Sequence, residues 1–492
     1  MTILSIPLRF SVAMASAWRT LSVFPPQQLL LLLLLLFICS SNTVVVSAQR
    51  HWNENDGHQH QSGGILLSEQ PITTLSNGKH MPLVGLGVGN LQHNLIESQI
   101  REGMRHNVRL IDTAHASNNE QVIARGIEQG VAAVRRDRQD SFSSDSREQV
   151  HVITKVWYTH LGYARTVLSV RDSLEALRVD AADVRVHVLI HWPYCRDDIS
   201  WMDCEGEEAR LPREVQEAGP APHLYKDNAW KESWRALEDI FTGDVELNSG
   251  YSSFPKVESI GVSNFEADEL HELLHVARVA PSILQANLWT ILFDPVLVNL
   301  CHAHHIHLQA FNLMNGVFGR ARERTPRALD SLWMISRSLK ASDGHEVSAP
   351  ELVIKWLVQN DVSVIPRTSS ERRLIENSPR LIYTIPELEE RNQEQVKHTM
   401  ALMMQGEDLE PPKAVFVNQH TDSNRHIHLF WANTESGEEH LVKEGLSPGD
   451  EFRTNTFPGH KFIAYDGHDP QNRQEFIVQA QYGEQERFHV EL

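Results

Sequence analysis

Short runs of β-branched and aliphatic residues alternate with amphipathic segments through the middle of the chain. The apolar runs predict strands, and the segments between them carry apolar residues at helical spacing. The expected strands are Val84–Leu86, Val108–Ile111, Val150–Lys155, Val184–His191, Ser259–Val262, Ile283–Ala286, His307–Phe311 and Val362–Pro366. The clearest helical patterns are Tyr163–Leu177, Trp230–Ile240, Glu266–Ala277 and Pro350–Asn360. Repeated strand–helix units predict an α/β fold in which parallel strands close into a (β/α)8 TIM barrel.

Segments outside this rhythm predict a hairpin and three inserts. Thr74–Leu83 has two extended runs across an Asn-Gly turn, which is typical of a β-hairpin. The segments 135–148 and 242–255 are polar loops. The third insert, Tyr194–Asp227, follows the strand that ends at His191. In a barrel this insert lies above the carboxyl ends of the strands, so we expect a lid, a substrate pocket or simple decoration there.

The last part of the chain has a different pattern. Leu388–Asp408 is charged and is expected to connect two domains, and Pro411-Pro412 marks their boundary. Beyond it the strands Ala414–Asn418, His426–Trp431, Phe452–Thr456 and Lys461–Tyr465 are separated by turn residues. This pattern predicts a small all-β sandwich.

The N-terminus has the composition of a targeting signal. Arg9 and Arg19 precede the unbroken leucine run Leu29–Leu36, and Val46-Ser47-Ala48 supplies small residues for signal cleavage. An uncleaved signal anchor is the alternative, but the polar residues 40–43 interrupt the apolar run and favour cleavage. We therefore expect the secretory pathway, either the ER lumen or secretion, or else membrane anchoring through this segment.

These patterns predict five segments. They are 1–48, a signal peptide or anchor; 49–67, a flexible linker; 68–390, the barrel; 391–412, a second linker; and 413–492, the β domain. The net charge of −19 argues against a nucleic acid partner, because phosphate binding needs a basic surface.

The cysteines allow one bridge. Cys195 and Cys204 lie in one loop and could form a disulfide in an oxidising compartment, or remain two thiols. Cys301 is expected to be a buried apolar residue. It begins the segment Cys301–His307, which contains four histidines but no metal-binding spacing, so no metal site is expected.

Three residues with acid–base chemistry come at the ends of expected strands. They are Asp112, Lys155 and His191. Because the carboxyl ends of barrel strands converge on one mouth, these side chains are expected to form one proton-handling cluster.

Several motifs together resemble the aldo-keto reductase family from Ile72 to Asn377. They are Leu110–Glu120, Gly261–Phe265, Gln285 and Val364–Thr368. The resemblance implies NADPH-dependent reduction of a carbonyl compound, with Asp112, Lys155 and His191 as catalytic residues. Ser117 stands where the family has its catalytic Tyr.

The resemblance also implies where the cofactor NADPH binds. Ser263, Asn264 and Gln285 match the residues that hydrogen-bond the nicotinamide carboxamide, and Phe311 matches the residue that stacks on the nicotinamide ring. Arg367 and Thr368 match residues near the cofactor phosphates. Arg373 and Asn377 match residues that contact the adenosine 2′-phosphate and the adenine.

With Ser117 at this position the proton donor is not identified, because a serine hydroxyl is a weaker acid than a phenol and the serine side chain is shorter. His191 or an ordered water could supply the proton, or the insert could bring in Tyr194 or Tyr225. Tyr158 is expected to be a packing aromatic. The alternative from another class is a pseudoenzyme whose barrel binds nucleotide and whose β domain binds a protein.

The C-terminal domain has a resemblance of its own. Val415–Asn418, Phe430–Asn433, Leu446–Gly449 and Thr456–His460 are similar to the β domain of the von Hippel–Lindau protein. That resemblance implies a peptide or hydroxyproline ligand near Asn455, Thr456 and His460, with a purely structural sandwich as the alternative. The expected partners are thus a small carbonyl substrate and a peptide or protein.

Overall fold

The computed structural model describes residues 71–137, 148–196, 198–245, 247, 255–314, 317–434 and 436–492. The predicted signal segment 1–48 and linker 49–67 lie outside these residues. Among the helices within these ranges, none combines the length and the apolarity that a bilayer span requires.

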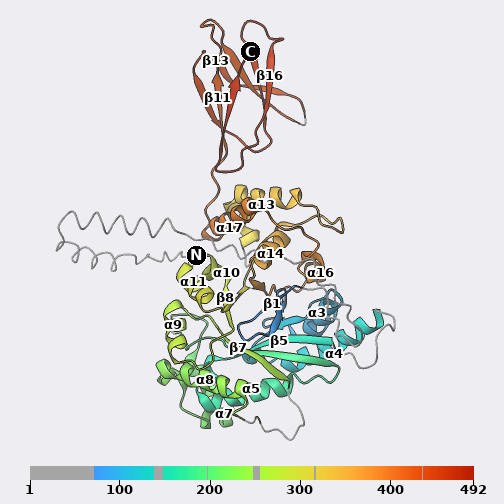
Figure 1. Cartoon of the computed structure of the whole chain (residues 1–492), viewed down its shortest axis with the longest axis vertical. Helices are drawn as coiled ribbons and strands as arrows, with labels where there is room; N and C mark the ends of the chain where they lie inside the picture. The colour runs from blue at the N-terminus through green and yellow to red at the C-terminus, as the bar shows by residue number, and fades with distance from the viewer. Residues whose placement is uncertain are drawn as a thin grey trace, which may run out of the picture. The chain divides into compact units, whose positions relative to one another are not determined.

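Eight parallel strands form one sheet in the order of the chain (Figure 1). They are β3 (Leu86–Gly87), β4 (Leu110–Asp112), β5 (Glu148–Val156), β6 (Ala182–Ile190), β7 (Lys256–Ser263), β8 (Ile283–Asn287), β9 (His307–Phe311) and β10 (Ser363–Val364). A parallel bridge between Val84 and Val364 joins the two edges, and the Gly85 and Val364 amides each donate a 2.8 Å hydrogen bond across it. The sheet therefore closes, as the predicted (β/α)8 barrel requires.

Helices follow the strands and cover the outside of the barrel (Figure 1). They are α3 (His93–Arg105), α4 (Glu120–Asp137), α5 (Tyr163–Ala176), α8 (Lys226–Thr242), α9 (Ala267–Val276), α10 (Leu288–Phe293), α11 (Pro295–Ala303), α12 (Val317–Arg324), α13 (Pro326–Ser338), α14 (Ala349–Gln359), α15 (Glu371–Glu376) and α16 (Pro379–Ile382). Helix α14 shows why the sequence begins a helix there: Ser348 and Glu351 form a reciprocal capping box, and Pro350 occupies the first turn.

The predicted hairpin closes one end of the barrel. Strands β1 (Ile72–Thr74) and β2 (His80–Pro82) pair antiparallel, and Leu75 and Met81 are buried in the apolar cluster inside the barrel. Asn77 donates a 2.9 Å hydrogen bond to the carbonyl of Glu258, near the start of β7. The hairpin thus covers the amino ends of the strands, which leaves the opposite end for a site.

The insert after β6 has its own short helices and a disulfide. Helices α6 (Cys204–Arg210) and α7 (Arg213–Glu217) and the 3₁₀ turn η4 (Pro222–Leu224) lead into α8. Cys195 and Cys204 are bonded, with their Cα atoms 5.9 Å apart. Cys301 is buried and free, and its burial raises the thiol pKa to about 12.

The segment 391–412 differs from the predicted linker. It contains most of helix α17 (Glu390–Gln405), in which Val396, Met400 and Met403 belong to the same apolar core as the barrel. The charged residues on the other face of α17 hid this helical spacing in the sequence. Gly406, with a φ of +78°, ends the helix, so the connection between the domains is shorter than predicted.

The C-terminal part contains two β-sheets, whose strands are antiparallel except for the parallel pair β11 and β17. One has the order β14-β11-β17 and the other β13-β12-β15-β16. Their strands are β11 (Lys413–Asn418), β12 (Ile427–Ala432), β13 (Glu439–Leu446), β14 (Glu451–Asn455), β15 (Lys461–Asp466), β16 (Arg473–Ile477) and β17 (Gln485–Val490). Phe416 of the first sheet lies 5.0 Å from Phe462 and 5.7 Å from Phe476 of the second, measured between ring centroids. The two sheets therefore share one apolar cluster.

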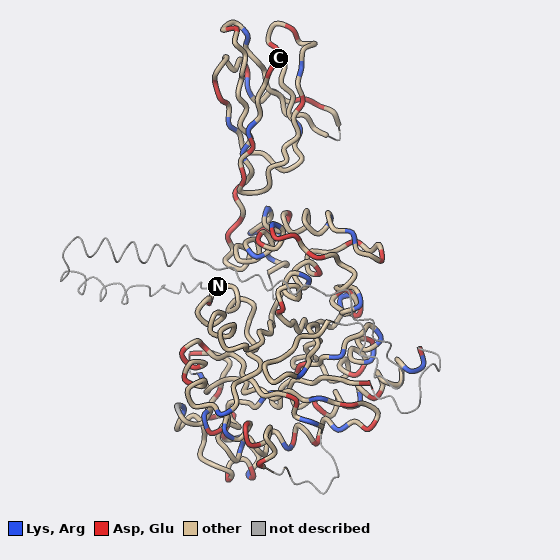
Figure 2. The backbone as a smooth tube through the Cα atoms, in the orientation of Figure 1, with Lys and Arg blue, Asp and Glu red and all other residues tan. Residues whose placement is uncertain are grey.

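Basic and acidic residues are interspersed along the chain, as the alternating blue and red of Figure 2 shows. The net negative charge is thus spread over many elements.

Candidate active site

An acid–base cluster lies where β4, β5 and β6 end. The Nζ atom of Lys155 donates to Asp112 Oδ1 at 2.6 Å and to the carbonyl of Thr113 at 2.7 Å. Gln285 Nε2 donates to the same Asp112 oxygen at 2.7 Å. Lys155 and Asp112 are both buried, so each charge depends on the other for compensation.

His191 follows β6 and faces the same cluster. Burial, and then the charge of Lys155, lower the pKa of His191 well below its usual range. Its imidazole is therefore neutral at pH 7 and carries one N–H donor. Asn264 fixes the backbone here, because its Nδ2 donates to the His191 carbonyl at 2.9 Å. Asn264 itself has a φ of +57°, a conformation that asparagine tolerates.

Ser117 ends the 3₁₀ turn η2 (His115–Ser117) after β4. Two hydrogen bonds hold this turn: Thr113 Oγ1 donates to Asn119 Oδ1 at 2.6 Å, and Asn119 Nδ2 donates to the Val88 carbonyl at 3.2 Å. Ser117, Asp112, Lys155 and His191 all line one cavity of about 1260 Å³. The structure thus brings the four predicted catalytic positions together.

No tyrosine belongs to the described residues that line this cavity. Tyr158 is fully buried as a packing residue. Tyr194 and Tyr225 of the insert lie outside the lining, and burial with a hydrogen bond to Glu269 raises the pKa of Tyr194 to about 12. The two insert tyrosines therefore do not replace the missing phenol in this arrangement.

Seven of the eight predicted cofactor positions line the same cavity. They are Asn264, Gln285, Phe311, Arg367, Thr368, Arg373 and Asn377. Ser263 does not: it is buried, and its Oγ accepts a 3.2 Å hydrogen bond from Asn264 Nδ2. Ser263 thus supports Asn264 from behind instead of reaching a ligand directly.

The two amides leave oxygen atoms for a ligand. Gln285 Nε2 is engaged by Asp112 and by Gln309, and Asn264 Nδ2 by the His191 carbonyl and Ser263. Each can therefore offer its Oδ1 or Oε1 as an acceptor, which suits the N–H groups of a carboxamide. The adjoining Phe311 provides an aromatic face, so these residues fit a nicotinamide.

Arginines gather at the other part of the lining. Arg322, Arg367 and Arg373 have no ion-pair partner within the described ranges, whereas Arg372 pairs with Glu376 at 3.4 Å. Unpaired guanidinium groups in a cavity fit phosphate groups. Sequence reasoning missed Arg322, although the run of arginines at 320, 322 and 324 was a signal for it.

The described part of the chain holds no group of three or more His, Cys, Asp or Glu side chains arranged for a metal ion. In the histidine-rich segment Cys301–His307, Cys301 and His307 are buried while His304 and His305 are exposed.

The sequence comparisons identify the family. The model of the aldo/keto reductase family matches residues 97–385, more than half of the chain. The chain therefore belongs to the aldo/keto reductase family, which confirms the resemblance seen in its motifs.

Among curated relatives, glyoxal reductase of Bacillus subtilis (strain 168) is 28% identical over 307 residues, 62% of this chain and 84% of that protein. The NAD(P)H-dependent D-xylose reductase of Kluyveromyces lactis is 24% identical over 306 residues, 62% of this chain and 85% of that protein. Among solved structures, the Bombyx mori aldo-keto reductase in complex with NADP has a TM-score of 0.48 and 20% identity, covering 68% of this chain and 93% of that one.

Proposed function

We propose that this chain is an NADP(H)-dependent oxidoreductase that reduces an aldehyde or ketone to an alcohol. One observation carries the proposal: the Asp112–Lys155 pair, His191 and three arginines that have no ion-pair partner among the described residues line a single cavity. Family membership supports the reaction class, and the names of relatives that act on glyoxal and D-xylose support a small carbonyl substrate.

The residues of the cavity have separable roles. Bound NADPH would supply the hydride, and Phe311, Gln285, Asn264 and the arginines are the residues that would hold it. Lys155 uses two of its three N–H groups on Asp112 and Thr113, which leaves one for a carbonyl oxygen or a water. The neutral His191 donates its one N–H to the same oxygen and orients it.

Proton delivery takes a different route from that of a phenol. The Ser117 side chain is too short and too weak an acid to give up its own proton. It can instead hydrogen-bond a water that fills the space beside it. We infer that this water, hydrogen-bonded to the Lys155 ammonium, passes one proton to the developing alkoxide oxygen and takes one from Lys155, which regains its proton from solvent after the alcohol leaves.

An NADPH titration of the full chain, followed by tryptophan fluorescence, tests the cofactor part. Saturable binding that is weaker for NADH and for Arg373→Ala would support it, because Arg373 is the predicted 2′-phosphate contact. Turnover of glyoxal by the NADPH-loaded protein tests the reaction. Absence of NADPH binding would contradict the whole proposal.

A second candidate function follows from the missing tyrosine. Because none of the described lining residues is a tyrosine, the barrel could be a pseudoenzyme that binds nucleotide without turnover. NADPH binding without reduction of any aldehyde in a panel would favour this alternative.

For the β domain we propose a sandwich similar to that of the von Hippel–Lindau protein, which binds a peptide. His460 Nδ1 lies 3.1 Å from Thr456 Oγ1, and its ring is 5.4 Å from that of Trp431. An imidazole beside an indole suits a hydroxyproline, because the imidazole can hydrogen-bond its hydroxyl group while the indole packs against its ring. Full-length chain should bind a hydroxyproline peptide more tightly than its proline counterpart, and His460→Ala should remove the difference.

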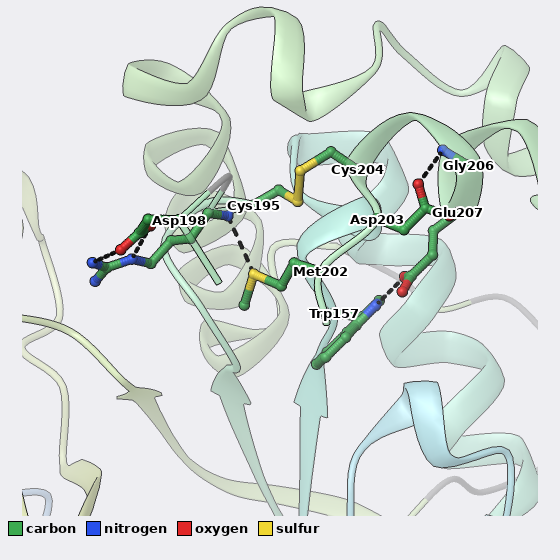
Figure 3. Close-up of a disulfide and its surroundings, with 9 residues drawn as sticks. Trp157, Cys195, Asp198, Met202, Asp203, Cys204, Gly206 and Glu207 are labelled. Atoms are coloured by element: carbon green, nitrogen blue, oxygen red, sulfur yellow. Dashed lines mark hydrogen bonds and ion pairs between the residues drawn. A yellow bond between two sulfur atoms is a disulfide. The ribbon is translucent and has the colours of Figure 1, made fainter. Parts of the chain in front are cut away.

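For localisation we propose the secretory pathway, with a membrane contact only if the N-terminal segment stays uncleaved. The Cys195–Cys204 disulfide (Figure 3) supports this, because disulfides persist in oxidising compartments. N-terminal sequencing of protein from its natural source would reveal cleavage near residue 48, and an intact Met1 would contradict it.

A further inference from the structure

Helix α9, on the outside of the barrel, carries two histidines one turn apart (Figure 1). They belong to the run His271-Glu272-Leu273-Leu274-His275, a spacing at which two imidazoles can bind the same zinc ion. The reason is that residues four positions apart in a helix lie one above the other on the same face. Both histidines are exposed, and neither belongs to the lining of the catalytic cavity. Helix α9 thus presents two metal-ligating side chains together on its solvent side.

The two rings turn their nitrogen atoms toward each other. His271 Nε2 and His275 Nε2 lie 3.0 Å apart, whereas the ring centroids are 4.5 Å apart. Two nitrogens that bind one tetrahedral zinc ion, each at about 2.0 to 2.1 Å, are separated by about 3.3 Å. A small rotation of either imidazole therefore gives the spacing that a metal ion requires. Each ring then carries its proton on Nδ1 and offers the lone pair of Nε2.

The helix that carries the pair is held in place without a ligand. At its start Glu266 and Glu269 form a reciprocal capping box, in which the Glu266 amide donates to Glu269 Oε2 at 2.7 Å. Leu270 and Leu273 are fully buried and attach the other face of α9 to the apolar core of the barrel. The backbone at both histidines is thus ordered in advance, so little conformational freedom is lost when they bind one ion.

The glutamate between the histidines is engaged by another residue. Glu272 Oε1 forms an ion pair with Lys231 Nζ of α8 at 2.5 Å. In hydrolytic zinc sites with this spacing the glutamate is the general base, whereas the Glu272 carboxylate contacts an ammonium group. Within the described ranges, no third His, Cys, Asp or Glu side chain completes a metal-binding group. The pair therefore has the features of a two-ligand binding site and not those of a second hydrolytic centre.

We propose that His271 and His275 form a surface site for one Zn²⁺ or Cu²⁺ ion. Imidazole suits both ions, whereas Mg²⁺ and Ca²⁺ prefer oxygen ligands. The ion joins the two Nε2 atoms, and water molecules fill its remaining positions. The site does not depend on the proposed carbonyl reduction, because neither histidine lines the catalytic cavity.

Chemical modification resolved by peptide tests the site in the full chain. Diethyl pyrocarbonate acylates accessible imidazole nitrogens, and a bound metal ion blocks them. At a Zn²⁺ concentration ten times its Kd, both His271 and His275 should react about tenfold more slowly, because about a tenth of the sites is then free. Mass spectrometry measures both rates. Mg²⁺ should change neither of them, and equal protection by Mg²⁺ would contradict a site built from imidazole.

Mutual dependence distinguishes one shared ion from two separate contacts. His271→Asn should remove the Zn²⁺ protection of His275, and His275→Asn should remove that of His271. His304→Asn is the matched control, because His304 is exposed at the end of α11, and it should leave both histidines protected. Protection of one histidine that persists without the other, or no protection in the unsubstituted chain, would overturn the assignment.

Calorimetric titration with Zn²⁺ gives a second measure, which counts ions in a chain with 27 histidines. The His271→Asn chain should take up one equivalent fewer than the unsubstituted chain, and the His304→Asn chain the same number. Equal uptake by all three chains would overturn the site. Repeating the titration with Cu²⁺ should give the same difference with a lower Kd, since Cu²⁺ binds nitrogen ligands more tightly than Zn²⁺.

Discussion

At the scale of single residues, Ser117 occupies the position at which the proposed reduction needs a proton donor. The cavity around Ser117 is lined by the other predicted catalytic residues, of which Lys155 and Asp112 are hydrogen-bonded to each other. We therefore expect Ser117→Tyr to raise kcat for an aldehyde about a hundredfold, because a positioned general acid contributes this much or more. The measurement is NADPH oxidation under saturating aldehyde.

Ser117→Phe is the control for that change, since it adds the ring without the hydroxyl and should leave kcat low. If Ser117→Tyr is no faster than Ser117→Phe, the lost phenol is not what limits the chemistry.

Removing only one partner of the Asp112–Lys155 pair should destabilise the fold, because it leaves the other charge buried alone. Lys155→Met removes one partner of a buried pair, so we expect the free energy of unfolding to fall by about 3 kcal/mol. Adding Asp112→Leu removes the charge left behind and should recover much of this loss. Urea denaturation followed by tryptophan fluorescence measures both, and simply additive losses would contradict the account.

At the scale of elements, Arg165 connects the insert to α5. Its guanidinium is buried and bonds Glu208 of α6 together with the carbonyls of Thr159 and Gly219. We expect Arg165→Met to leave Glu208 unpaired and to loosen α6 and α7, with cleavage between 204 and 217 in limited proteolysis.

Arg171→Met is the matched control, because Arg171 is partly exposed and its ion pairs with Asp172 and Glu214 lie at the surface. It should leave the proteolysis pattern unchanged. Resistance of the Arg165→Met insert would show that the disulfide alone is sufficient.

Elements whose apolar residues recur at a clear helical or strand spacing were predictable from the sequence. Elements in which polar and charged residues obscure that spacing were not. Helix α5 begins at the predicted Tyr163 and ends within one residue of the prediction. Strand β13 was missed, because all of its residues except Lys443 and Leu446 are exposed and no alternating apolar signal remains. Helix α17 was missed because its many charged residues obscured the helical spacing of its buried residues, such as Val396, Met400 and Met403.

At the scale of the whole molecule, buried histidines inside the barrel should make stability depend on pH. His151 Nδ1 and His187 Nε2 are 3.0 Å apart, and His187 Nδ1 lies 2.7 Å from Ser259 Oγ. Burial lowers the pKa of His151 to about 4 and that of His187 well below its usual range. His307 is likewise lowered by burial to about 4.

The sign follows from linkage. The unfolded chain binds a proton at each of these histidines near pH 6.5, whereas the folded chain keeps them neutral. Their stabilising contribution is therefore complete above pH 6.5 and is lost as the pH falls from 6.5 toward about 4. We expect Tm to fall steadily in this window in a series of thermal melts. His187→Asn should flatten the dependence, and an unchanged slope would contradict the assignment.

The family and the location of the site followed from sequence, because motifs at strand ends are local. Asp112, Lys155 and His191 could be placed at one mouth, since parallel strands in a barrel end on the same side. Contacts between distant segments could not be placed in this way. Ser263 turns behind Asn264, and Arg322 joins Arg367 and Arg373 in the cavity lining from a helix between β9 and β10.

The sequence by itself thus determined the alternation of strands and helices, the hairpin, the family motifs and the serine at position 117, all of which depend on neighbours along the chain. Only the tertiary structure decided that Cys195 and Cys204 are bonded, that Tyr194 and Tyr225 stay out of the cavity and that Trp201 enters it. The physical reason is that these outcomes depend on the packing of an insert against strands far away in sequence, and spacing carries no information about such distances.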